Sequence, residues 1–118
     1  MQRHVICKRD ELKPGTVRPA KVGGRRLAIA CVEEGTYRAF SDTCPHEMAS
    51  LARGTVEKMW LSNGTGQLHR AEERCVIVCP WHNFEFDLET GLSPCEPERL
   101  RIKTYPATLE GDEIVVRL

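Results

Sequence analysis

Two short segments of this chain each place a cysteine and a histidine close together: Cys44-Pro45-His46 and Cys79-Pro80-Trp81-His82. Thiolates and neutral imidazoles are the side chains that borderline and soft metals bind. The fold must therefore bring two loops, well separated in the sequence, to one point in space. This requirement constrains the chain more than its composition does.

Length and charge set the outer limits. A chain of 118 residues is long enough for one domain with a modest core that needs no disulfide staples. It carries 17 basic and 17 acidic residues, which favours neither nucleic acid nor an anionic membrane as a partner. No run of about 18 apolar residues could span a bilayer, and the first ten residues are too polar for a secretion signal. We expect one soluble, cytoplasmic, monomeric domain over residues 1–118.

The six cysteines do not form a disulfide pattern. Cys44 and Cys79 each have a histidine nearby, a spacing that indicates a metal site before it indicates a disulfide. The other four are scattered, and we expect them to be small buried hydrophobic residues: Cys7, Cys31, Cys75 and Cys95.

Short apolar runs separated by turn residues predict an all-β fold, an antiparallel sandwich or meander. Turns are expected at Gly23-Gly24 and Glu34-Gly35, and Gly111-Asp112 is expected to join the last two strands as a hairpin. The predicted strands cover residues 16–22, 27–32, 37–40, 84–88, 102–105 and 113–118.

Between the two Cys/His segments lies a polar stretch, about residues 54–74, longer than a simple connection between strands requires. Asn63-Gly64 is typical of a hairpin turn within it. One interpretation is a peripheral excursion that packs Trp60 and Leu61 onto the domain. The other is a flap that docks a partner beside the metal site. We favour the first, because most loop insertions are tolerated rather than used.

The segment from Cys79 to Asp87, followed by Thr90-Gly91, resembles the second cluster loop and hairpin of Rieske ferredoxins and of oxygenase Rieske domains. Leu51 matches the leucine of the first loop, and residues 93–97 match the proline-containing third loop. The resemblance covers most of the chain and is weakest before Gly35. It implies a Rieske-type domain with a small cluster-binding subdomain, whose loops span about residues 42–53 and 76–97.

The resemblance also implies a ligand set for a Rieske [2Fe–2S] cluster: Cys44 and Cys79 on the inner iron, His46 and His82 on the outer iron. Such a centre carries one electron, which takes the site from a charge of about zero to about −1. Structural zinc is the rival interpretation. We prefer iron, because Cys44-Pro45-His46 is tight for a single tetrahedral ion. The remaining histidines, His4 and His69, are expected on the surface.

Departures from the family pattern bear on the loops and on the potential. Asn83 and Met48 stand where the family has glycines, and Ala49 and Trp81 replace a disulfide found in high-potential members. Phe84 and Phe86 occupy the positions of hydroxyl donors to the cluster sulfurs. Fewer such donors stabilise the reduced state less, so we expect a potential of roughly −150 mV rather than +300 mV.

The leading functional hypothesis is a soluble one-electron carrier that passes electrons from a reductase to a terminal oxygenase or a similar acceptor. Rieske oxygenases carry a second iron site of two histidines and a carboxylate in a separate large domain. This chain leaves only His4 and His69 and has no room for such a domain, and no Gly-rich dinucleotide motif is present, so we expect no catalysis by the chain alone. The alternatives are a small Rieske subunit of a reductase complex, similar to that of assimilatory nitrite reductase, and a redox-sensing module.

Overall fold

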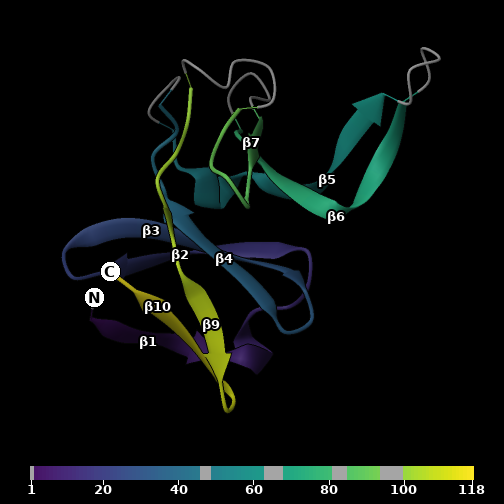
Figure 1. Ribbon diagram of the computed structural model, residues 1–118. Helices are drawn as coiled ribbons and strands as arrows, with labels where there is room; N and C mark the ends of the chain where they lie inside the picture. The colour runs from purple at the N-terminus through teal and green to yellow at the C-terminus, as the bar shows by residue number, and fades with distance from the viewer. Residues whose placement is uncertain (1, 46–48, 63–67, 81–84, 94–99) are drawn as a thin grey trace.

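The computed structural model describes residues 2–45, 49–62, 68–80, 85–93 and 100–118, with only the backbone described at residues 58–62 and 68–74. The described part contains three antiparallel sheets and two short 3-10 turns, with no α-helix (Figure 1). The predicted all-β fold is confirmed. In the described part, no helix has the length and apolar character that crossing a membrane requires.

Two sheets form the part of the molecule that we call the base. One has the order β1 (Arg3–Lys8), β10 (Glu113–Arg117), β9 (Ala107–Glu110). The other has the order β2 (Thr16–Val22), β3 (Arg25–Glu33), β4 (Thr36–Ser41), β8 (Thr104–Tyr105). A 3-10 turn, η1 (Arg9–Glu11), follows β1.

The third sheet belongs to the opposite part of the molecule, which we call the loop end. Its order is β5 (Thr55–Ser62), β6 (Leu68–Val78), β7 (Glu85–Asp87), and the 3-10 turn η2 (Leu51–Arg53) leads into it. The β5–β6 hairpin extends away from the rest of the molecule, as the teal arrows of Figure 1 show. Residues 54–74 thus contribute an antiparallel hairpin, while Asn63-Gly64 and the side chains of Trp60 and Leu61 lie outside the described part.

Strand β3 separates two apolar cores. Its residues from Leu27 to Cys31 are all buried, because both faces of its sheet are covered. Leu27, Ile29 and Cys31 pack in the base core, together with Tyr37, Ile114 and Val116. Ala28 and Ala30 point the other way, into the loop-end core, together with Phe40, Leu51, Ile77 and Phe86. The small alanines let the loop end pack closely against the base.

The expected turns have the backbone that glycine favours. Gly24 has a φ of 81° between β2 and β3, and Gly35 has a φ of 85° between β3 and β4. Strand β2 covers residues 16–22 as predicted.

The predicted hairpin turn at Gly111-Asp112 is confirmed, but residues 102–105 are not its first strand. The Gly111-Asp112 turn joins β9 to β10, with Glu110 opposite Glu113. The segment 104–105 pairs instead with β4, with Thr104 opposite Phe40. Pro106 stands between β8 and β9. Proline has no N–H for a ladder, so strand pairing is interrupted where the chain passes from one sheet to the other.

Candidate metal centre

The first loop, residues 43–50, leaves the end of β4 and returns at η2. Two backbone hydrogen bonds close its two ends on each other. Leu51 N donates to Asp42 O at 2.6 Å, and Cys44 N donates to Ala49 O at 2.9 Å. Together they define an isolated antiparallel bridge between Thr43 and Ser50. The loop therefore starts as a short ladder, which fixes the backbone of Cys44.

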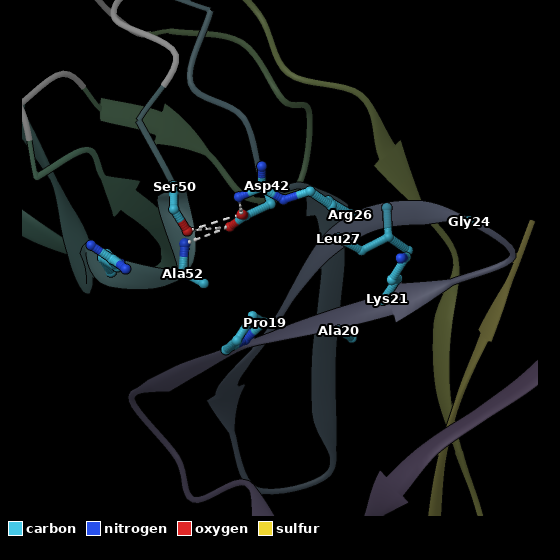
Figure 2. Close-up of a pocket in the computed structure, with 10 residues that line it drawn as sticks. Pro19, Ala20, Lys21, Gly24, Arg26, Leu27, Asp42, Ser50 and Ala52 are labelled. Carbon is cyan, nitrogen blue, oxygen red and sulfur yellow. Dashed lines mark hydrogen bonds and ion pairs between the residues drawn. The ribbon is translucent and has the colours of Figure 1, made fainter.

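A buried carboxylate strengthens this closure. Asp42 is 2% exposed. Its oxygens accept a hydrogen bond from the Ser50 hydroxyl at 2.9 Å and one from the Ala52 amide at 2.9 Å. Arg26 Nη2 on β3 adds a charged donor at 3.1 Å. Figure 2 shows these groups converging beside an open cleft. One side chain thus joins the entrance of the first loop, its exit and the base sheet.

The second loop begins at Cys79, directly after β6, and ends where β7 begins. Its two ends are held by strand pairing, because Val78 lies opposite Glu85 and Ile77 lies opposite Phe86. On its other side β6 pairs with β5, where Val78 lies opposite Thr55. Cys79 therefore projects from the end of a central strand.

Gly54 lets the chain pass close to the root of the second loop, where β6 ends at Val78. A Cβ atom at Gly54 would lie 1.9 Å from the carbonyl oxygen of Val78. Any side chain there would push the segment that follows the first loop away from the strand that precedes the second. Glycine at position 54 is thus a condition for the two loops to share one end of the molecule.

A third turn follows β7. The carboxylate of Asp87 accepts the Glu89 amide at 2.8 Å, and Gly91 takes a φ of 80°. Gly91 O then accepts the Ile102 amide at 2.7 Å, and Ser93 N donates to Leu100 O at 3.0 Å. These hydrogen bonds pair the segment before residues 94–99 with the segment after them, and residues 94–99 themselves lie outside the described part.

The structure brings the two candidate thiolates into one place. Cys44 and Cys79 are both 0% exposed and belong to the same apolar core, although they come from separate loops. Two buried sulfur donors from separate loops fit the inner iron of an asymmetric cluster. Within the described residues no group of three possible metal ligands occurs. The imidazole candidates, His46 and His82, lie outside that part of the chain, as do Met48, Trp81, Asn83, Phe84 and Cys95.

The other described cysteines are placed as follows. Cys7 and Cys31 are buried in the base core as free thiols, in agreement with the expected hydrophobic role. Burial raises the pKa of each thiol above its ordinary value, which keeps both protonated. Cys75 is half-buried on β6, against the loop-end core.

Comparison with known proteins identifies the family. The model of the Rieske [2Fe-2S] domain matches residues 2–106, and the chain belongs to this family. The ferredoxin component of the naphthalene 1,2-dioxygenase system of Pseudomonas aeruginosa is 32% identical over 108 residues, 92% of this chain and 88% of that protein.

Solved structures agree in fold. The ferredoxin of carbazole 1,9a-dioxygenase from Nocardioides aromaticivorans IC177 has a TM-score of 0.74 at 25% identity, covering 98% of this chain and 97% of its own. A protein assigned as the small subunit of an NADH-dependent nitrite reductase from Mycobacterium tuberculosis has a TM-score of 0.81 at 22% identity. The coverage there is 99% of this chain and 96% of that one.

The cofactor of this family is a Rieske-type [2Fe-2S] cluster, and the paired buried thiols fit it. The sequence singled out both cysteines as candidate ligands but gave no role to Asp42 or Gly54. The only signal for Asp42 is an acidic residue two positions before Cys44, and acidic residues are usually exposed. Its burial becomes visible only when Arg26, Ser50 and Ala52 are placed around it.

Proposed function

We propose that this chain is a soluble one-electron carrier that accepts an electron from a reductase and delivers it to a terminal oxygenase or a similar acceptor. Cys44, His46, Cys79 and His82 are the proposed ligands. The observation that carries the proposal is the burial of Cys44 and Cys79 in one core in a member of the Rieske family. The bound cluster would supply reversible one-electron chemistry near the surface.

The described residues do what an electron carrier requires of its protein. The ladder at the first loop and the β6–β7 pairing at the second hold both sulfur atoms in fixed positions. The apolar core around them excludes water, so little needs to rearrange when the charge of the site changes. Phe86 is fully buried and has no hydroxyl to donate to sulfur, in keeping with the low potential expected from the sequence.

We further propose that the chain acts as a cytoplasmic monomer and that its partners are redox proteins. The ferredoxin relatives of dioxygenase systems support an oxygenase as the acceptor. A role as the small subunit of a reductase complex is the alternative, and purification of the protein from its native cell tests it. Stable co-purification with a large sirohaem subunit would replace our proposal with that role.

The decisive experiment is an absorption and EPR spectrum of the anaerobically purified protein, with iron, zinc and sulfide analysis. We expect iron and acid-labile sulfide in equal amounts and a Rieske signal on reduction. Cys44→Ser and Cys79→Ser should lose most of the bound cluster, and His46→Cys or His82→Cys should change the spectrum. Cys31→Ser is the matched control, a buried cysteine in the other core that should keep the signal. Stoichiometric zinc without sulfide would overturn the proposal.

A further inference from the structure

The carboxylate of Asp42 links groups that are distant in the sequence. It receives the hydroxyl of Ser50 and the amide of Ala52 from the exit of the first loop, and the guanidinium of Arg26 from the base. Its own backbone closes the same loop, since Asp42 O accepts from Leu51 and Asp42 N donates to Arg26 O at 3.2 Å.

The ion pair between Arg26 and Asp42 is lopsided. The side chain of Arg26 is 70% exposed, whereas that of Asp42 is 3% exposed. Arg26 also lines the open cleft of about 760 Å³ in Figure 2, together with Lys21 and Arg53. Water there screens the positive charge strongly, whereas the buried negative charge is screened much less.

The buried charge lies two residues from Cys44, a proposed ligand. Adding an electron to the centre adds negative charge to the same low-dielectric end of the molecule. A fixed negative charge there stabilises the oxidised centre relative to the reduced one. The hydrogen bonds of the same carboxylate meanwhile hold Ser50 and Ala52, at the exit of the loop, against its entrance at Asp42.

We propose that Asp42 is a positioning residue with two effects on the redox centre, an inference that rests on the proposed function. Its hydrogen bonds fix the geometry of the first loop. Its buried charge lowers the midpoint potential more than the exposed charge of Arg26 raises it. The two effects separate chemically, because asparagine keeps the shape and an acceptor oxygen but loses the charge.

The test compares variants of the cluster-loaded protein by voltammetry at one pH and by EPR of the reduced state. Asp42→Asn should raise the midpoint potential with little change in the EPR line shape. Asp42→Ala should raise it and also broaden the EPR lines, because the loop loses its restraints. Ser50→Ala keeps the charge, so it should broaden the lines and leave the potential nearly unchanged.

Two controls make the comparison sharp. Arg26→Gln should shift the potential downward and by less than Asp42→Asn shifts it upward. Glu34→Gln removes an exposed acidic charge in the turn between β3 and β4 and should change neither measurement.

An unchanged potential in Asp42→Asn, or an equal and opposite shift in Arg26→Gln, would overturn the charge effect. An unchanged line shape in Asp42→Ala and Ser50→Ala would overturn the positioning effect. If the wild-type protein shows a Rieske signal, either of these results for the variants leaves the proposed function intact. A wild-type protein without that signal overturns the proposed function itself. If Asp42→Ala does not fold, Ser50→Ala and Asp42→Asn still decide both points.

Discussion

The two loops that carry the candidate ligands are held by different means. The first is closed by a short bridge and by one buried side chain, Asp42. The second is closed by the backbone ladder of β6 with β5 and β7, and by the close approach of Gly54 to Val78. The first loop should therefore respond to changes in side-chain chemistry, and the second to changes in backbone shape.

The largest effect is expected from Gly54→Ala, which attacks the root of the second loop. The new Cβ atom would lie 1.9 Å from Val78 O, so the backbone must move. We expect a loss of about 3 kcal/mol or more in folding free energy, with a clear drop in the melting temperature. Gly35→Ala is the control, because its Cβ meets no atom within 4 Å and only the left-handed φ of 85° is strained. Equal losses in the two variants would contradict the close approach.

A matched pair of hydroxyl deletions comes next. Ser50→Ala removes a hydrogen bond to a buried carboxylate at the first loop, at an expected cost of about 1.5–3 kcal/mol. Thr55 lies at the root of the second loop, where its hydroxyl donates to exposed Glu57. Thr55→Ala should therefore change the stability by less than about 0.5 kcal/mol. Similar melting temperatures for the two variants would remove the contrast between the loops.

The folding stability of the two-sheet base of the molecule, measured at alkaline pH, provides a reference for both loops. Burial raises the pKa of the Cys31 thiol above 9.0, its ordinary value. Above that pH the unfolded chain loses this proton before the folded chain does. The contribution to stability is thus complete below pH 9.0 and is lost as the pH rises toward the folded-state pKa. Melting temperatures measured from pH 8 to pH 10.5 should fall less steeply in Cys31→Ala than in the wild type. Equal slopes would show that Cys31 does not contribute.

A small effect is also expected from Arg26→Gln on folding stability. The side chain of Arg26 is 70% exposed, so water screens its half of the ion pair, and we expect a loss of less than about 1 kcal/mol. A loss close to that of Ser50→Ala would mean that the cation, rather than the two loop donors, dominates the contacts of Asp42. Denaturation of both variants at two salt concentrations checks this, because only the ion pair is screened by salt.

Local patterns predicted what depends on local structure. The strand over residues 16–22 and the turn at Gly35 follow from composition and from the need for positive φ. The two candidate cysteine ligands were named from their spacing to histidines, and their assignment stays a prediction. The pairing of β1 with β10, with Arg3 opposite Arg117, could not be predicted in this way, because neither strand specifies its partner.

The missed parts of the site have the same cause. Nothing near Gly54 in the sequence indicates that Val78 will come close to it, and nothing near Asp42 indicates that Arg26 will face it. The hairpin turn at Gly111-Asp112 was predicted, but its first strand was misplaced, because residues 104–105 pair with β4 instead. Contacts between distant residues decided each of these points.

The enclosure of Cys44 and Cys79 has a consequence for biogenesis. Cys44 and Cys79 are fully buried in the same core as Phe40, Leu51 and Phe86, so we expect the folded chain to take up iron and sulfide slowly. Maturation of a centre at these cysteines would then precede the closure of this core or require it to reopen. The same barrier would protect a loaded centre from chelators in the cell.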